Sequence, residues 1–247
     1  VPFFNEKAVC ELGKNLDKSK KLHRSGTEYA LKVLKRFSEI LNVSKITNLK
    51  IIATAVLREA TDTKPFINEV EKLFKTKINI LSGEEEAECS AEGVKIGFEN
   101  VNGLVADLGG GSLELARVEN NIVTNKTSLP VGVLRLLNNP IVKKRNLAKY
   151  IKKLLREEKW LSKKKFNNLY LVGGTWRALF KLHLFQNNHP VHIIHQYSID
   201  NNVLSKFVEK ISSFNKSKLK TVEYISKSRT AYLPYSCIIL DEIMRVT

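Results

Sequence analysis

The chain has 247 residues, and its 41 Lys and Arg against 25 Asp and Glu give a formal net charge of +16. This length is enough for one large domain or two ordinary ones with real cores, so the fold needs no disulfide framework or structural metal. No apolar run approaches the roughly 20 residues that span a bilayer, and no charged-then-apolar leader opens the chain, so we expect a soluble, cytoplasmic protein without membrane contact.

The cysteines and the chain ends support two further expectations. Cys10, Cys89 and Cys237 lie far apart, with no pair at metal-ligand spacing, which indicates reduced thiols in a reducing compartment. The chain begins with Val1 rather than methionine, and its single methionine is Met244. We therefore expect the parent protein to extend beyond both ends.

Helix and strand signals alternate in the first hundred residues. The apolar stripe of Ala30, Val33, Leu34, Phe37 and Leu41 predicts a core-packed helix from Thr27 to Leu41. A short apolar strand is expected next, followed by a helix, a second strand and a helix that begins after the turn at Ser82-Gly83. Their expected ranges are Leu49 to Ala53, Pro65 to Phe74, Ile78 to Leu81, and Glu84 to Ile96.

The rest of the chain continues this alternation. Leu104 to Ala106 is expected to be a short buried strand that ends in Asp107, and Leu169 to Val172 another. Hairpin partners of the first are expected at Leu113 to Val118 and Ile122 to Leu129, and a helix at Trp176 to Phe185. Strands alternating with helices predict an α/β fold. A break near Glu99 to Asn102 places a first lobe at residues 1–100 and a second lobe at 101–247.

Positive charge is densest between Lys143 and Lys165, where eleven Lys and Arg face only Glu157 and Glu158. Apolar residues in this segment fall at i, i+3, i+4, i+7 and i+8, which predicts an amphipathic helix with lysines on its outer face. These are Leu147, Tyr150, Ile151, Leu154 and Leu155. The outer face is either ordinary solvated surface or a surface that binds a polyanion.

The strongest chemical signal is the run from Asp107 to Glu114, which contains Gly109, Gly110, Gly111 and Ser112. A buried strand delivers the Asp107 carboxylate, and glycines directly after it allow backbone N–H groups to approach phosphate oxygens closely. Carboxylates beside such a cradle suit Mg²⁺, which takes one or two protein carboxylates together with phosphate oxygens and water. A plain glycine-rich hairpin turn is the alternative interpretation.

Three weaker motifs have ordinary structural explanations when each is taken alone. Ser82 to Ala87 contains three glutamates in a first helical turn, where acidic residues favour the helix dipole. Gly173-Gly174-Thr175 connects a strand to a helix, whose N-terminus can bind an anion or simply form a turn. Ala53 to Ala60 brings Arg58 after a strand end, where it can meet phosphate or remain a surface arginine.

Three histidines, His189, His192 and His195, stand at three-residue spacing. No cysteine or clustered carboxylate accompanies them, and Pro190 interrupts the run. We interpret them as structural residues rather than zinc ligands.

The ordered combination of motifs resembles the Ppx/GppA phosphatases, which comprise exopolyphosphatases and guanosine pentaphosphate phosphohydrolases. The matching segments cover nearly the whole chain. They are Phe4 to Lys7, Ala53 to Ala60, Ser82 to Ala87, Asp107 to Glu114, Ser128 to Gly132, Gly173 to Arg177 and His192 to His195. The resemblance implies an actin-like, ribonuclease H-like fold of two α/β lobes, of which the first is expected to be incomplete here.

The resemblance also implies roles for individual residues. Glu86 matches the family's catalytic glutamate, which orients and deprotonates the attacking water, and Asp107 and Glu114 match its metal and phosphate-site carboxylates. The implied cofactor is Mg²⁺, and the implied activity is release of terminal orthophosphate from polyphosphate or guanosine pentaphosphate. Candidate phosphate contacts are Gly109, Gly110, Gly111, Ser112, Arg58, Gly173, Gly174 and Thr175.

Two departures from the family pattern put the activity of this polypeptide in question. The opening phosphate loop of the family is expected before Val1, and Leu233-Pro234-Tyr235 stands where a Pro-Gly pair is usual. An inactive fragment is therefore one alternative. A polyanion-binding or RNA-binding protein is another, although the basic helix lacks an RNA-binding signature, which makes nucleic acid the less favoured partner.

An ATP-dependent kinase or ATPase of the same fold is the third alternative, and the glutamate segment argues against it. The basic surface favours polyphosphate over guanosine pentaphosphate as the substrate. By resemblance, a homodimer is also expected.

Overall fold

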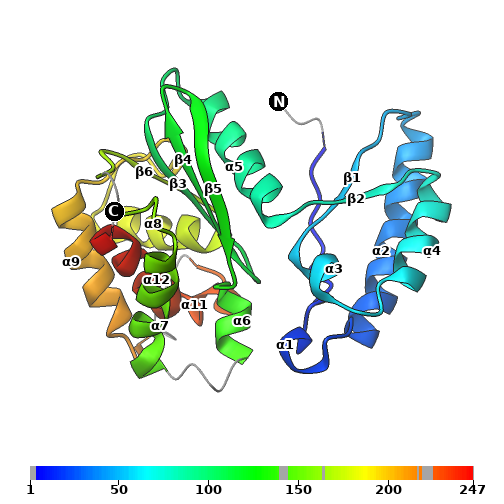
Figure 1. Ribbon diagram of the computed structural model, residues 1–247. Helices are drawn as coiled ribbons and strands as arrows, with labels where there is room; N and C mark the ends of the chain where they lie inside the picture. The colour runs from blue at the N-terminus through cyan, green and yellow to red at the C-terminus, as the bar shows by residue number, and fades with distance from the viewer. Residues whose placement is uncertain (1–3, 139–143, 163–164, 216, 219–224, 247) are drawn as a thin grey trace. The chain divides into compact units, whose positions relative to one another are not determined.

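The computed structural model describes residues 4–138, 144–162, 165–215, 217–218 and 225–246 (Figure 1). The chain divides into two compact units between Ser82 and Gly83. Both units combine helices with strands, so the predicted α/β class is confirmed. The lobe boundary expected between residues 100 and 101 stays a prediction, although helix α5 (Gly83–Gly97) belongs by its contacts to the second unit.

The first unit packs two long helices against a small parallel sheet. Its elements are α1 (Leu16–Ser19), α2 (Arg24–Val43), β1 (Ile51–Ala53), α3 (Ala55–Glu59), α4 (Lys64–Phe74) and β2 (Ile78–Ile80). Strands β1 and β2 pair in parallel, with Ile51 opposite Ile78. The core of the unit is formed by Ala30, Leu57, Phe66 and Val70. The predicted helices and strands of this unit are confirmed, with ends that agree within three residues.

The second unit is built on a four-stranded mixed sheet in the order β5-β4-β3-β6. Strand β3 (Gly103–Leu108) is antiparallel to β4 (Leu113–Glu119) and parallel to β6 (Leu169–Val172). Strand β5 (Ile122–Leu129) pairs with the outer side of β4. The helices are α5, α6 (Val133–Asn138), α7 (Lys144–Glu157), α8 (Gly174–Gln186), α9 (Asn201–Ser212), α11 (Lys227–Thr230) and α12 (Leu233–Val246).

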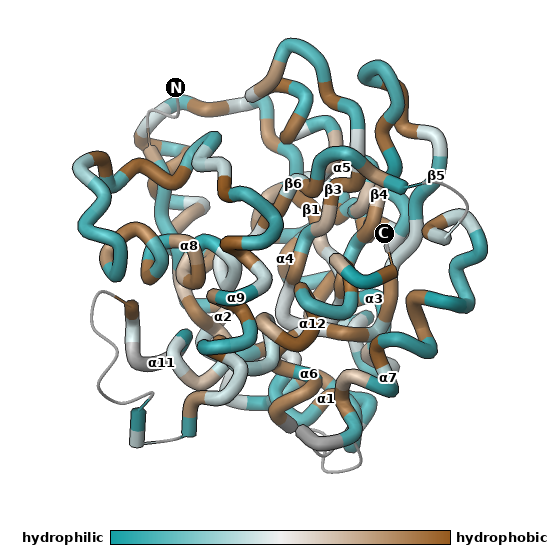
Figure 2. The backbone as a smooth tube through the Cα atoms, turned by 90° about the vertical axis from the view of Figure 1, so that its left-hand side faces the viewer, coloured by the Kyte–Doolittle hydropathy of each residue, from teal (hydrophilic) through white to brown (hydrophobic). Residues whose placement is uncertain are grey.

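Both faces of this sheet are covered by helices. Because successive strand residues point to opposite faces, Leu104 and Ala106 of β3 join the main core with α7, α8, α9 and α12. Val105 joins a second core with Ala87 and Ala91 of α5. Figure 1 shows α5 on one side of the sheet and α8, α9 and α12 on the other. The amphipathic alternation along the helices is visible in Figure 2.

The predicted elements of the second unit are confirmed, but helices α6, α9, α11 and α12 were not predicted. Helix α12 contains the apolar stretch Cys237 to Leu240, and Pro234 is its second residue, where the missing N–H costs nothing. Helix α9 begins after Asp200, whose side chain accepts a hydrogen bond from the Asn202 amide. Within the described parts of the chain, no helix has both the length and the apolar character needed to cross a membrane.

Candidate active site

Polar residues line up across three neighbouring strands on the face of the sheet that α5 covers. Asp107 of β3 lies directly opposite Glu114 of β4, and Glu114 lies opposite Ser128 of β5. Asp107 shares the α5 face with Val105, and Glu114 shares it with Ala116, because side chains two residues apart point the same way. The strand register therefore places both predicted carboxylates side by side at one end of this face.

Helix α5 contributes the third side of the site. Glu86 and Ser90 are four residues apart and hence on the same face of the helix. The Ser90 hydroxyl donates a 2.7 Å hydrogen bond to Oδ2 of Asp107. The first residue of the helix, Gly83, packs so closely on β5 that a Cβ atom there would lie 2.3 Å from Cβ of Ser128. The helix that carries Glu86 is thus fitted tightly against the strands that carry the carboxylates.

Glu114 is buried, with 2% of its surface exposed, and this burial has an electrostatic consequence. Loss of solvent raises the pKa of the Glu114 carboxyl to about 7, and the negative charges of Glu86 and Asp107 add to the increase. Hydrogen bonds from Ser112 and Ser128 lower the pKa of the Glu114 carboxyl in part. The hydrogen bond that Ser128 Oγ donates to Glu114 Oε1 is 2.8 Å long. The negative charges of Glu86 and Asp107 therefore both act on the buried Glu114 carboxyl, an arrangement that favours a bound cation.

The carbonyl groups of the glycine turn between β3 and β4 accept hydrogen bonds from residues of α6. The amides of Val133 and Leu134, in the first turn of α6, donate to the carbonyls of Gly109 and Gly110 at 3.2 and 3.0 Å. The Arg135 guanidinium donates to the Gly111 carbonyl at 2.7 Å. The Gly109 amide closes the turn by donating to the Ser112 carbonyl at 3.0 Å.

This arrangement reduces the number of backbone amides that can belong to the predicted anion cradle. Since the Gly109 amide is used inside the turn, the amides of Gly110, Gly111 and Ser112 remain as candidates to meet phosphate oxygens. Gly132 permits the arrangement, because a Cβ atom at this position would lie 2.2 Å from the Gly110 carbonyl oxygen. The glycines here are required by close backbone packing as well as by any ligand.

The second predicted phosphate turn adjoins the first. Gly173 follows β6 with φ 112°, a conformation that favours glycine, and a Cβ atom there would lie 3.0 Å from Oδ1 of Asp107. Gly174 begins α8, and its carbonyl accepts a 2.9 Å hydrogen bond from Arg229 of α11. Thr175 is buried in the first turn of α8. Both glycine turns thus lie beside the Asp107 carboxylate.

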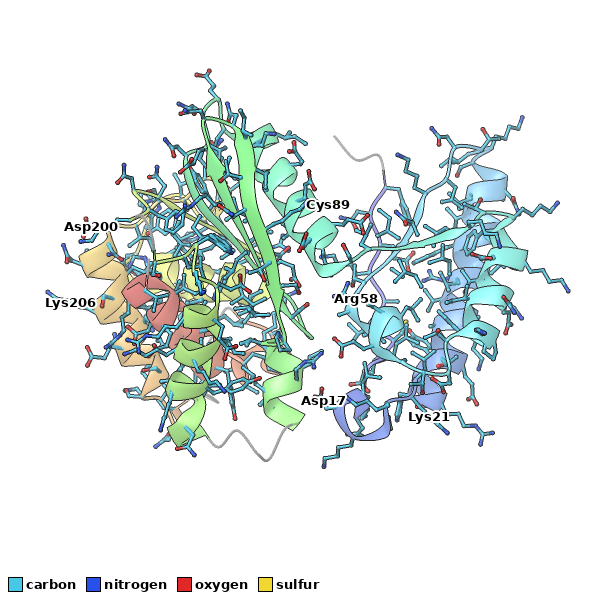
Figure 3. The ribbon with its side chains drawn as sticks, viewed as in Figure 1. Asp17, Lys21, Arg58, Cys89, Asp200 and Lys206 are labelled. Atoms are coloured by element: carbon cyan, nitrogen blue, oxygen red, sulfur yellow. The ribbon has the colours of Figure 1, made fainter. Side chains whose placement is uncertain are left out.

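Arg58 is placed in the first unit, near the end of α3, and is labelled in Figure 3. Its guanidinium donates to the carbonyl of Leu81 in the same unit. Its predicted contact with phosphate therefore stays a prediction. Cys89, which Figure 3 labels on α5, is exposed and forms no disulfide.

The side chains available as ligands determine which kind of metal site is possible here. Among the residues that the structure describes, no group of three or more His, Cys, Asp or Glu is arranged to hold a metal ion by itself. Asp107 and Glu114, paired across β3 and β4, offer two carboxylates beside the predicted phosphate cradle. That set fits Mg²⁺, which keeps several waters and takes phosphate oxygens as further ligands. It does not fit a dedicated all-protein cage.

The sequence interpretation missed three polar residues around the site: Ser90, Ser128 and Arg229. Ser90 had a detectable signal, because it follows Glu86 at the i+4 position of the same predicted helix. Ser128 lies in the Ser128 to Gly132 motif, but only the β4–β5 register places it opposite Glu114. Arg229 had no local signal, since its position beside Gly174 depends on long-range packing.

Solved structures with this architecture show the class of fold. The chain matches the crystal structure of an exopolyphosphatase from Cytophaga hutchinsonii with a TM-score of 0.86, covering 99% of this chain and 82% of that chain at 19% identity. It matches the Ppx/GppA family member from Aquifex aeolicus with a TM-score of 0.76, covering 97% and 80% at 18% identity. These likenesses confirm the predicted actin-like α/β fold class.

The family follows from the sequence match. The model of the Ppx/GppA phosphatase family matches residues 2–247, so the chain belongs to the Ppx/GppA phosphatase family. It is 29% identical over 260 residues to a bifunctional 3-dehydroquinate synthase/phosphatase of Fusobacterium nucleatum, covering 98% of this chain and 38% of the relative. It is 37% identical over 134 residues to a guanosine-5'-triphosphate,3'-diphosphate pyrophosphatase of Aeromonas hydrophila, covering 54% and 27%. The chain thus spans well under half the length of these curated relatives.

Proposed function

We propose that this chain is a phosphoric anhydride hydrolase that releases terminal orthophosphate from inorganic polyphosphate or guanosine pentaphosphate. One observation carries the proposal: the negative charges of Glu86 and Asp107 act on the buried Glu114 carboxyl beside two adjoining glycine turns. Phosphoryl transfer requires chiefly positioned anion-binding groups, charge neutralisation and a carboxylate that manages the nucleophile. The site contains residue types for each of these tasks.

In this proposal, Glu86 orients a water molecule toward the terminal phosphorus and takes its proton as the new P–O bond forms. The amides of Gly110, Gly111 and Ser112, with the first turn of α8, bind the phosphate oxygens. Asp107 and Glu114 would hold Mg²⁺, which would supply charge neutralisation on the transferring phosphate. Ser90 fixes the direction in which the Asp107 carboxylate points.

The names of the relatives support a substrate with a terminal phosphoric anhydride. They do not distinguish polyphosphate from guanosine pentaphosphate. The Cytophaga hutchinsonii structure is described as an exopolyphosphatase, and the Aeromonas hydrophila relative as a guanosine-5'-triphosphate,3'-diphosphate pyrophosphatase. Both substrates end in a phosphoric anhydride, so one site chemistry serves both. A cytoplasmic location and a homodimer complete the proposal.

The test is release of orthophosphate by the purified chain from long-chain polyphosphate, guanosine pentaphosphate and ATP, each with Mg²⁺ and with EDTA. We expect Mg²⁺-dependent release from polyphosphate or guanosine pentaphosphate and little release from ATP. Release from ATP alone would favour an ATPase. No release from any of the three substrates would contradict the hydrolase proposal.

A further inference from the structure

Helix α7 presents four cationic side chains in one stripe. Lys149, Lys152, Lys153 and Arg156, which we call the basic stripe, are all exposed and occupy positions i, i+3, i+4 and i+7 of the helix. The opposite side of α7 is fixed in the core by Leu147, Ile151 and Leu155, which are at most 1% exposed. The buried stripe sets the rotation of the helix, so the basic stripe faces solvent along its length.

The basic stripe is unusual among the exposed helix faces of this protein. Residues three and four apart on a helix are neighbours, so the stripe contains several like-charged neighbouring pairs, which destabilise a helix in water. Cations on α2, α5 and α12 instead form ion pairs with acidic neighbours on their own helix, namely Arg24–Glu28, Lys95–Glu92 and Arg245–Asp241. Within the described residues, the one ion pair of the stripe is a 3.8 Å contact of Lys153 with Glu157.

Helix α7 lies close in the chain to elements that carry the candidate active site. Before α7 comes α6, whose first-turn amides hold the glycine turn. After it, the Glu158 carboxylate accepts hydrogen bonds of 2.9 Å from Thr127 of β5 and from the Trp160 indole. Helices α6 and α7 lie at the same end of the second unit in Figures 1 and 2. The basic stripe therefore belongs to the unit that contains the carboxylates, and its helix is packed in the core of that unit.

We propose that the basic stripe is a second binding surface for a linear polyphosphate chain, separate from the residues that act on its terminal phosphate. A flexible chain of closely spaced negative charges relieves the repulsion among the four cations and needs no base recognition. Single-stranded nucleic acid fits less well, because such sites add aromatic side chains on which bases stack. The aromatic residues of this segment, Tyr150 and Trp160, pack against the core instead. This inference rests on the proposed function for its choice of substrate.

The test compares two fourfold variants with the unaltered chain. One carries Lys149→Gln, Lys152→Gln, Lys153→Gln and Arg156→Gln. The control carries Lys32→Gln, Lys35→Gln, Lys64→Gln and Lys72→Gln, which remove the same charge from exposed positions of α2 and α4. Binding of long-chain polyphosphate and of tripolyphosphate is measured in EDTA over a series of salt concentrations. No turnover is needed, so a failure of the proposed hydrolase activity would leave the binding result readable.

We expect the basic-stripe variant to bind long-chain polyphosphate at least about 10-fold more weakly and to lose about 3 from the salt slope, at about 0.7 for each lost contact. Its affinity for tripolyphosphate and its release of phosphate from guanosine pentaphosphate should match those of the control. Equal affinities and slopes in both variants would overturn the proposal. Tighter binding of an oligoribonucleotide of equal charge than of polyphosphate would also overturn it, in favour of nucleic acid.

Discussion

At the scale of single residues, the chemistry concentrates on Glu114 and Asp107. Both sit on the sheet face that α5 covers, beside the apolar residues Val105, Ala116 and Val118. Each carboxylate is held by at least one serine, Glu114 by Ser128 and Asp107 by Ser90. The apolar surroundings strengthen the electrostatic interactions of these groups, and the serines fix their directions.

The raised pKa of Glu114 predicts how stability depends on pH. In the folded protein this pKa is about 7 instead of 4.5, so the folded state favours the protonated carboxyl. Its contribution is fully present below pH 4.5 and is lost as pH rises toward 7, on the order of 3 kcal/mol in total. In Glu114→Gln, urea unfolding in EDTA should show a smaller decline over this range and greater stability at pH 8. The exposed control Glu84→Gln should behave as the unaltered chain does; equal declines in all three would contradict the assignment.

Ser90 is predicted to be a positioning residue for Asp107. Ser90→Ala removes the 2.7 Å hydrogen bond to Oδ2, so the carboxylate loses its fixed direction. Loss of such a support typically costs about 10-fold or more in metal affinity or activity. Steady-state phosphate release over a Mg²⁺ titration should therefore show a weaker apparent Mg²⁺ affinity and a lower kcat, with little change in urea midpoint. Ser90→Thr keeps the hydroxyl and should restore both values; equal defects in the two variants would point to packing.

At the scale of elements, the glycine turn and α6 are joined by hydrogen bonds and close packing. The first-turn amides of α6 donate hydrogen bonds to the carbonyls of Gly109 and Gly110. Gly132 stands at the point of closest approach between the two segments. The conformation of the turn therefore depends on packing as well as on its own glycines.

Two glycine substitutions separate this packing effect from backbone flexibility. Gly132→Ala would place Cβ 2.2 Å from the Gly110 carbonyl oxygen, so the turn must move, and we expect a lower urea midpoint and a loss of phosphate release. Gly93→Ala, inside α5, meets no atom within 4 Å and should stabilise the helix by about 0.5–1 kcal/mol with activity retained. Similar effects of the two substitutions on stability would contradict the described packing of the turn.

At the scale of the whole molecule, periodicity predicted most elements, since the apolar stripes of α2, α4 and α7 each match one buried helix face. Helix α12 was missed because it is apolar nearly all round, and such a run does not distinguish a buried helix from a strand. The carboxylates and glycines of the site were recognisable from their order in the chain. Their partners Ser128 and Arg229 were not, because register and long-range packing bring them there.

The central claim is that Glu86, brought to Asp107 and Glu114 by α5, acts as the base in phosphate release. The most direct measurement is kcat for Mg²⁺-dependent phosphate release from polyphosphate and guanosine pentaphosphate by Glu86→Gln, with Glu84→Gln as the matched control on the same helical turn. We predict that Glu86→Gln lowers kcat by about 10²- to 10⁴-fold, the usual contribution of a general base, while the control keeps the original rate. Equal rates in the two variants would contradict the claim and remove Glu86 from the catalytic site.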